Sequence, residues 1–141
     1  MGFASLHNGE IGEYICALRL LKLGISCRIV NMGATDIIAE YNNKMWRIQV
    51  KSSALKGKKS IHDKNKSYQF AVSKGGKKTP FTTNDCDIIA LIAIDREQII
   101  FVPVNKLVNQ TTKRLPKEKF SEHSGMHTWM DCMKYFSEKG L

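Results

Sequence analysis

Residues 36–53 constrain the fold most strongly, because apolar and polar side chains alternate on both sides of Asn42 and Asn43. Such alternation is typical of β-strands, in which successive side chains point to opposite faces. Asparagine tolerates the positive φ that a tight hairpin turn requires, so we predict two antiparallel strands joined at this turn. Counting outward from the turn gives the opposed pairs: Tyr41 with Lys44, Ala39 with Trp46, Ile37 with Ile48, and Asp36 with Gln49.

The two faces of this predicted hairpin differ in chemistry. One face is apolar and is expected to join the core; it carries Ile37, Ala39, Trp46, Ile48 and Val50. The other face brings Asp36, Gln49 and Lys51 together at one end, since directly opposed Cβ atoms lie roughly 5 Å apart. A carboxylate, an amide and an ammonium group are therefore expected to meet there.

These three side chains suit a hard metal ion. Mg²⁺ takes oxygen ligands, and usually only one or two carboxylates with water. Asp36 supplies a carboxylate, Gln49 an amide oxygen, and the backbone carbonyl of Val50 a third oxygen. Lys51 would stand beside metal-bound water, as metal-assisted phosphodiester hydrolysis requires. The same residues on an ordinary solvated sheet face are the alternative that the pattern leaves open.

The order Asp36 and then Gln49-Val50-Lys51 resembles the PD-(D/E)XK nuclease motif, in the variant that has Gln at the second acidic position. The helix opening at residue 9 is similar to the first helix of archaeal Holliday junction resolvases, in which Glu13 matches the acidic position eleven residues before Gly24. Residues 85–104 are similar to small intron-encoded homing endonucleases. The resemblance covers residues 8–108, with Gly33-Ala34-Thr35 replacing the motif's proline.

This resemblance implies a restriction-endonuclease-like α/β core, with a central mixed β-sheet flanked by helices. It implies catalytic roles for Glu13, Asp36, Gln49 and Lys51, and metal binding by Glu13, Asp36, Gln49 and the Val50 carbonyl. The expected cofactor is Mg²⁺, for which Mn²⁺ can substitute. The expected substrate is double-stranded DNA. Because cutting both strands takes two active sites, a homodimer or homotetramer is expected.

The charge of the chain supports a polyanionic partner. The formal net charge is +9 and the pI is about 9.5. Lysine and arginine are clustered, and each phosphate that they neutralise adds salt-dependent affinity. A solvated basic loop is the alternative for residues 51–66. The candidate DNA contacts are Ser52, Ser53, Lys56, Lys58, Lys59, Lys64, Lys66, Lys77, Lys78, Lys113 and Arg114.

Several other classes of protein are disfavoured. No apolar run is long enough to cross a membrane and no signal peptide is evident, so an intracellular protein is expected. The four cysteines lack Cys-x-x-Cys spacing, which favours free buried thiols over zinc binding or disulfides. Residues 74–78 lack the P-loop pattern, and no nucleotide cofactor is expected. Asp85 and Asp87 are interpreted as caps of a loop.

We expect one domain over residues 1–141. Its first helix spans residues 9–23, with an apolar face formed by Ile11, Tyr14, Ile15, Leu18, Leu21 and Ile25. Further strands are predicted at residues 26–30, 68–73, 87–94 and 99–104, and a C-terminal amphipathic helix at about 122–139.

The sequence therefore predicts a metal-dependent DNA endonuclease, with a site-specific homing-type enzyme favoured over a Holliday junction resolvase. A DNA-binding module without catalysis is the competing class. Gln49 is its best support, since loss of an acidic ligand is expected in an inactive descendant, whereas the presence of Glu13, Asp36 and Lys51 together argues against it.

Overall fold

The computed structural model describes residues 3–55, 67–75 and 79–141. Its elements follow one another in this order: α1 (Phe3–Lys22), β1 (Ser26–Met32), β2 (Thr35–Tyr41), β3 (Lys44–Ser53), β4 (Ser67–Ala71), β5 (Ser73–Lys74), β6 (Thr79–Pro80), β7 (Ile88–Ala93), β8 (Gln98–Pro103), the 3₁₀ turn η2 (Val104–Lys106), β9 (Thr112–Pro116), the 3₁₀ turn η3 (Lys117–Lys119) and α2 (Ser124–Glu138).

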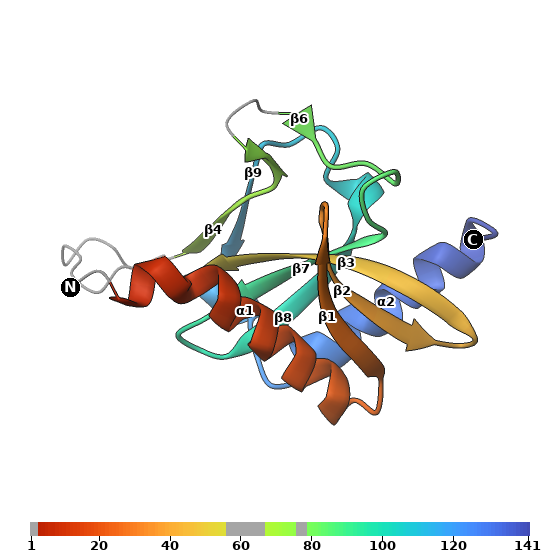
Figure 1. Cartoon of the computed structure of the whole chain (residues 1–141), viewed down its shortest axis with the longest axis horizontal. Helices are drawn as coiled ribbons and strands as arrows, with labels where there is room; N and C mark the ends of the chain where they lie inside the picture. Colours follow the sequence, from red (N-terminus) through yellow and green to blue (C-terminus); the bar gives the residue numbers. More distant parts are fainter. Residues whose placement is uncertain (1–2, 56–66, 76–78) are drawn as a thin grey trace.

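A five-stranded mixed sheet forms the centre of the molecule, with the strand order β1-β2-β3-β7-β8 (Figure 1). Its strands run antiparallel except for β3 and β7, which are parallel neighbours. All six residues of β7 are buried, as expected for a strand covered on both faces. The predicted α/β class with a central mixed sheet is therefore confirmed.

The hairpin of β2 and β3 has the predicted register. Tyr41 pairs with Lys44, Ala39 with Trp46 and Ile37 with Ile48. The turn residues Asn42 and Asn43 have positive φ angles of 53° and 63°, which explains why asparagine is found at both positions.

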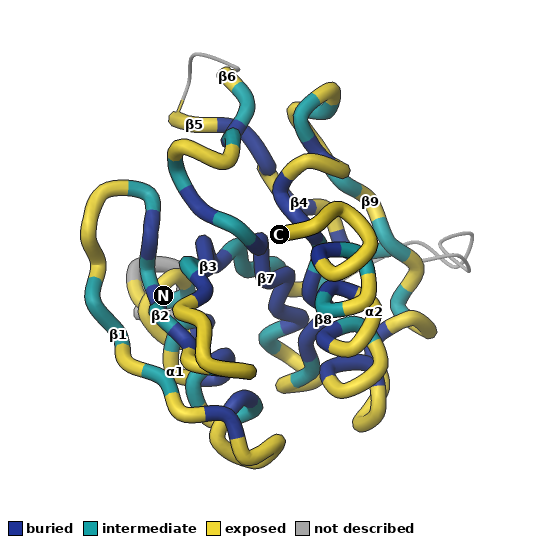
Figure 2. Tube along the Cα trace, turned by 90° about the vertical axis from the view of Figure 1, so that its right-hand side faces the viewer, coloured by how far each residue is buried: buried dark blue, intermediate teal, exposed yellow. Residues whose placement is uncertain are grey.

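Both helices pack on one face of this sheet. Ile15, Cys16 and Leu20 of α1, and Trp129, Cys132 and Phe136 of α2, share a core with the apolar face of β2 and β3. The opposite face is covered by the two-stranded ribbon of β4 and β9 and by the segment around Phe81. Figure 2 shows the sheet buried between these layers, with exposed residues along the outer sides of α1 and α2. None of the helices in the described ranges is long and apolar enough to cross a lipid bilayer.

The face of α1 that packs on the sheet differs from the prediction. Four of the residues assigned to its buried side are exposed instead: Ile11, Tyr14, Leu18 and Leu21. The sheet is contacted through Ile15, Cys16 and Leu20. Gly12, which has no side chain, lets α1 approach β3 closely. The helix is thus apolar on two sides, and residues 3–55, 67–75 and 79–141 cover only one of them.

The division of one predicted strand and the pairing of β4 with β9 were not predicted. The predicted strand at residues 68–73 is divided into β4 and β5, and β4 pairs with β9 within the basic segment that was treated as an arm. Residues 56–66 and 76–78, which hold most of the predicted DNA-contacting lysines, lie outside the described residues. The four cysteines are free, as predicted.

Candidate active site

Asp36 stands at the beginning of β2, where the ladder between β2 and β3 ends. The last paired residues are Ile37 and Ile48. Beyond them, the Val50 N–H donates a 2.8 Å hydrogen bond to Oδ2 of Asp36 instead of to a strand carbonyl. The preceding residue is also fixed, because Thr35 is buried and its hydroxyl donates to the Asp85 carbonyl over 2.9 Å. The Asp36 carboxylate is therefore held by both strands of the hairpin.

Glu13 reaches this point from α1. The helix lies against β3 at Gly12, where an added Cβ would collide with Ser52 Oγ and would lie 3.5 Å from Val50 Cγ1. This close approach sets the next residue, Glu13, near Asp36. Burial raises the pKa of Glu13, and the neighbouring Asp36 carboxylate raises it further, whereas a hydrogen bond from the Asn31 side chain lowers it. Asn31 lies at an irregularity of β1 and has a positive φ of 50°.

The two carboxylates carry an electrostatic cost in the absence of a cation. Burial also raises the pKa of Asp36, while the Val50 N–H and the charge of Lys51 lower it. The net result for both Glu13 and Asp36 is a pKa above the ordinary value of the carboxyl group. Two acids whose pKa values are raised mainly by burial, one of them also by the charge of the other, are typical of sites that bind a cation.

Gln49 and the Val50 carbonyl supply further oxygen atoms. The side chain of Gln49 is buried, and its Nε2 donates to the Val50 carbonyl over 3.3 Å. Rotation of this side-chain amide by half a turn would place its oxygen where its nitrogen now lies. Within residues 3–55, 67–75 and 79–141, no three His, Cys, Asp or Glu side chains form a metal-binding group. The oxygen donors here are two carboxylates, one amide and one carbonyl, which fit a hard divalent cation.

Lys51 lies on the same face of β3 as Gln49, two residues further along. Its ammonium group is 5.1 Å from the centre of the Phe81 ring, in a cation–π contact. Phe81 is buried in the core beneath β7. This contact was not predicted, because Phe81 is distant in sequence and only the fold brings it to Lys51.

The loop before β7 is held by ion pairs, which explains Asp85 and Asp87. Asp87 accepts from the Arg47 guanidinium, with a closest distance of 3.1 Å between oppositely charged atoms. Asp85 pairs with Lys74 at 2.9 Å and accepts from the Thr82 N–H. These contacts agree with the interpretation of both acids as caps of a loop.

The predicted DNA-contacting residues differ in how far they are exposed to solvent. Ser52 Oγ is buried beneath α1 without a hydrogen-bond partner, so we no longer assign Ser52 to DNA. Ser53 is half-buried at the end of β3. In β9, Lys113 is half-buried, and Arg114 is exposed and donates to the Gln69 side chain over 3.1 Å. The predicted contacts that lie outside the described residues are Lys56, Lys58, Lys59, Lys64, Lys66, Lys77 and Lys78.

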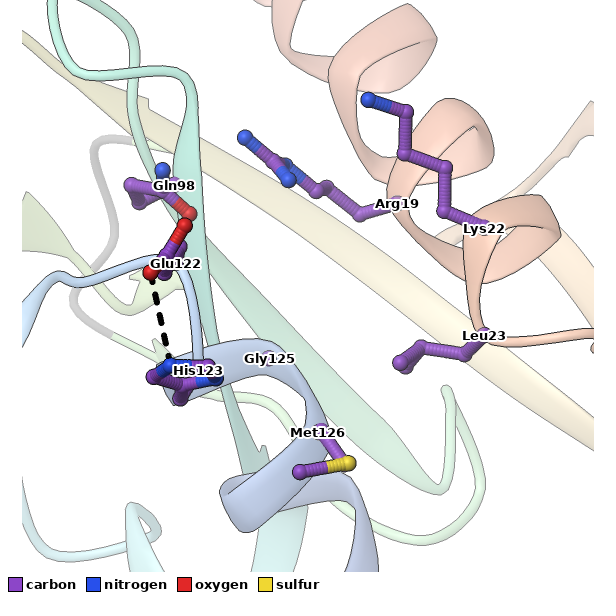
Figure 3. Close-up of a pocket in the computed structure, with 8 residues that line it drawn as sticks. All are labelled: Arg19, Lys22, Leu23, Gln98, Glu122, His123, Gly125 and Met126. Atoms are coloured by element: carbon purple, nitrogen blue, oxygen red, sulfur yellow. Dashed lines mark ion pairs between the residues drawn. The ribbon is translucent and has the colours of Figure 1, made fainter.

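A hollow lies between the end of α1 and the beginning of α2, and is lined by Arg19, Lys22, Glu122 and His123 among others (Figure 3). The Arg19 guanidinium donates to the Glu97 carbonyl over 2.9 Å, and His123 stands 3.4 Å from Glu122. The hollow includes none of the residues gathered around Asp36. It is therefore separate from the candidate active site.

Comparisons with known proteins agree with this architecture. The sequence pattern of the PD-(D/E)XK endonuclease family matches residues 4–129. Among solved structures, the bacterial homing endonuclease I-Ssp6803I is similar, with a TM-score of 0.58 and 20% sequence identity over 77% of this chain and 72% of that chain. A search of the curated proteins finds no match.

The chain belongs to the PD-(D/E)XK endonuclease family. Membership makes it a nuclease with DNA as its substrate class, and nucleases of this family generally use divalent metal ions. The match includes all the residues gathered around Asp36, from Glu13 to Lys51.

Proposed function

We propose that this chain is a Mg²⁺-dependent endonuclease that hydrolyses phosphodiester bonds of double-stranded DNA, with its active site at the edge where β2 and β3 separate. The observation that carries the proposal is the meeting of Glu13 and Asp36 from different elements. Their pKa values are both raised, and a lysine on the same strand edge lowers that of Asp36. No structural requirement of the hairpin explains why two acids should share this place.

Four groups of this site would hold the metal: the carboxylates of Glu13 and Asp36, the Gln49 amide oxygen and the Val50 carbonyl. The bound metal would supply Lewis-acid activation of water and of the scissile phosphate. Lys51 would orient the attacking water and stabilise the charge that develops on the phosphate oxygens. Phe81 would keep the Lys51 ammonium at this position.

DNA binding is assigned to the basic residues on the side of the sheet that carries Lys51. Among the described residues, Ser53, Lys113 and Arg114 remain candidates. The lysines of residues 56–66, which follow β3 in sequence and lie outside the described residues, remain predicted DNA contacts. Contacts of basic side chains with phosphates position the DNA backbone and make the affinity for DNA depend on the salt concentration.

Within this class we favour a site-specific homing-type enzyme over a Holliday junction resolvase. The structural similarity to I-Ssp6803I supports this preference through the fold. A binding module without catalysis is the competing function. The hydrogen bond from Gln49 to the Val50 carbonyl favours that alternative, because it engages a carbonyl that the metal would need.

The test is cleavage with Mg²⁺ of two substrates, a four-way DNA junction and a library of long linear duplexes, with EDTA as the metal-free control. Cutting of one duplex sequence supports the homing-type proposal. Cutting of the junction alone would assign a resolvase. Binding to DNA without cutting of either substrate would overturn the proposed catalysis and leave the binding module.

A further inference from the structure

The face of the central sheet that carries the active site is open along β1, β2 and the beginning of β3. Over β7 and β8 this face is covered by the ribbon of β4 and β9 and by the segment around Phe81. Over the other strands, by contrast, Arg28, Glu40 and Met45 are exposed. Figure 2 shows β1 at the side of the molecule, exposed along most of its length. The described residues therefore leave this part of the sheet, here called the open face, accessible to a partner.

The open face continues directly from the active site. Side chains alternate along a strand, so Asp36 and Ile38 of β2 point to the same side of the sheet. Arg28 of β1 pairs with Ile38, and Ile38 pairs with Arg47 of β3. Directly paired residues of antiparallel strands share a face. Arg28 and Arg47 thus lie in one row across the sheet, and this row crosses β2 two residues beyond Asp36.

This row is close enough to Asp36 for both to contact one DNA backbone. Two residues of a strand span about 7 Å, and neighbouring strands lie about 5 Å apart, so the Cα atoms of Arg28 and Asp36 are separated by roughly 8 Å. One strand of a DNA duplex advances about 3.4 Å along the axis for each phosphate. The long side chain of Arg28 can therefore reach a phosphate that neighbours one bound at the active site.

Arg28 differs from Arg47 in how its charge is used. The Arg47 guanidinium is paired with Asp87, at a closest distance of 3.1 Å. The ion pairs within residues 3–55, 67–75 and 79–141 do not include Arg28, and its side chain is exposed. A guanidinium group matches the geometry of a phosphate and can donate two parallel hydrogen bonds to it. Arg28 is therefore the basic side chain of this row that is available to a phosphate.

Glu40 limits where a phosphate can lie on the open face. It pairs with Ser26 of β1 and with Met45 of β3, so its carboxylate lies further from the active site than Arg28 does. Between Arg28 and Glu40 the surface is hollowed and mostly apolar, and its lining includes Val30, Ile38 and Met45. The charge of Glu40 repels phosphates from the far end of the face, so the favourable place for one is beside Arg28.

We propose that the DNA duplex extends from the active site over the open face, and that Arg28 binds a backbone phosphate near the scissile one. This inference rests on the proposed function for its ligand, which is duplex DNA. Arg28 then positions the duplex and contributes no base recognition, because a phosphate is the same in every sequence. The contact comes from the edge strand β1, whereas the candidate contacts Lys113 and Arg114 lie on β9.

A charged residue on an edge strand also has a purely structural use. Such residues oppose pairing of the exposed strand with a strand of another molecule. In that role Arg28 would protect the protein from aggregation and would contribute nothing to the affinity for DNA. Titration with DNA at different salt concentrations separates the two roles, because a phosphate contact releases counterions and a solvated charge does not.

The test is the affinity of the full chain for linear duplex DNA, measured by fluorescence anisotropy between about 50 and 200 mM salt. EDTA keeps the DNA uncut. Arg28→Ala is expected to reduce the slope of log K against log salt by about 0.9, the value of one phosphate contact. The affinity advantage of the unmodified protein over Arg28→Ala should therefore shrink roughly threefold over this range. Arg28→Lys keeps the charge and should keep the slope.

Two controls make the measurement specific. Lys134→Ala removes one exposed positive charge from α2, which packs on the opposite face of the sheet, and it should leave the slope unchanged. Two duplexes of different base composition distinguish a phosphate contact from a base contact. Arg28→Ala should lose the same factor in affinity for both duplexes. Circular dichroism establishes that each variant is folded, and Arg28→Gln repeats the test with a longer neutral side chain.

The outcomes separate this inference from the proposed catalysis. A reduced slope for Arg28→Ala supports the contact even if Mg²⁺ produces no cleavage, in which case only the proposed catalysis fails. An unchanged slope for folded Arg28→Ala and Arg28→Gln overturns the contact even if the protein cuts DNA. The inference is also overturned if the unmodified protein does not bind duplex DNA, if only one of the two duplexes is affected, or if Lys134→Ala reduces the slope equally.

Discussion

The Val50 N–H donates a 2.8 Å hydrogen bond to Oδ2 of Asp36. A strand residue turns its N–H and its C=O to the same side, so the Val50 carbonyl also faces the beginning of β2. The contact therefore brings a carboxylate and a carbonyl to one edge, just beyond the last pair of the β2–β3 ladder. Glu13, Gln49 and Lys51 are gathered around this relationship, and the following predictions depend on it.

Replacing Phe81 tests how Lys51 is held. Phe81→Leu removes the ring whose centre lies 5.1 Å from the Lys51 ammonium. A cation–π contact contributes about 0.5–2 kcal/mol, which corresponds to a decrease of roughly 2- to 30-fold in kcat. The KM for DNA should change little. Phe81→Tyr keeps a ring and should retain most of kcat. Equal kcat values for Phe81→Leu and the unmodified protein would show that Phe81 does not hold Lys51 in its catalytic position.

The acidic pair makes the metal-free protein sensitive to pH. Glu13 has an ordinary pKa of 4.5 that is raised by burial and by Asp36, so the folded state binds its proton more tightly than the unfolded state does. The free energy of unfolding should therefore fall as pH rises from 4.5 through the raised pKa. Glu13→Gln should flatten this dependence and raise the metal-free Tm at neutral pH.

Thermal unfolding in EDTA between pH 4 and 8 measures this effect. Glu138→Gln is the matched control, because Glu138 is exposed at the end of α2 and is not among the groups that shift the pKa of Glu13, and it should leave the pH dependence unchanged. Addition of Mg²⁺ should raise the Tm of the unmodified protein more than that of Glu13→Gln. A metal-free stability that rises steadily across this pH range would contradict the predicted sign.

The contact between α1 and β3 predicts a strong effect of one methyl group. Gly12→Ala would force a Cβ against Ser52 Oγ, so α1 must shift and carry Glu13 away from Asp36. The Tm should fall by several degrees and cleavage should be largely lost. Ser52→Ala alone should be tolerated, because its hydroxyl is buried without a partner. The double variant should recover part of the Tm, and failure to recover any would show that Ser52 is not the obstacle.

Gln49→Glu tests the position at which this chain departs from the acidic form of the motif. The new carboxylate would lie against the Val50 carbonyl in a buried place, so the metal-free Tm should fall. A third carboxylate should strengthen Mg²⁺ binding at least tenfold, as measured by calorimetric titration. Gln110→Glu is the control. Unchanged affinity in Gln49→Glu would mean that residue 49 does not contact the metal.

The hairpin was predictable because two local signals agree. The alternation of side chains fixes which residues share a face, and the turn at Asn42 and Asn43 fixes the register. The same alternation sets Ser52 on the buried face with Ile48 and Val50, so its position beneath α1 was also readable from the sequence. Its assignment to DNA neglected this signal.

The orientation of α1 was not predictable from periodicity alone. Large apolar side chains occupy two sides of the helix, so the pattern does not show which side is buried. The side that includes Gly12 contacts the sheet, because the missing side chain there permits close approach to β3, and a hydrophobic pattern does not register this effect. Phe81 and Asn31 were missed for a different reason, because their contacts with Lys51 and Glu13 exist only in the folded chain.

The most direct test of the central claim is Mg²⁺-dependent cleavage of linear duplex DNA by Asp36→Asn and Lys51→Met, compared with the unmodified protein and with Asp131→Asn, a matched exposed control on α2. Binding to DNA is measured in parallel. The account predicts that both active-site variants lose cleavage by at least a hundredfold while still binding DNA, and that Asp131→Asn cleaves normally. Undiminished cleavage by Asp36→Asn or Lys51→Met would contradict the placement of the active site at this edge.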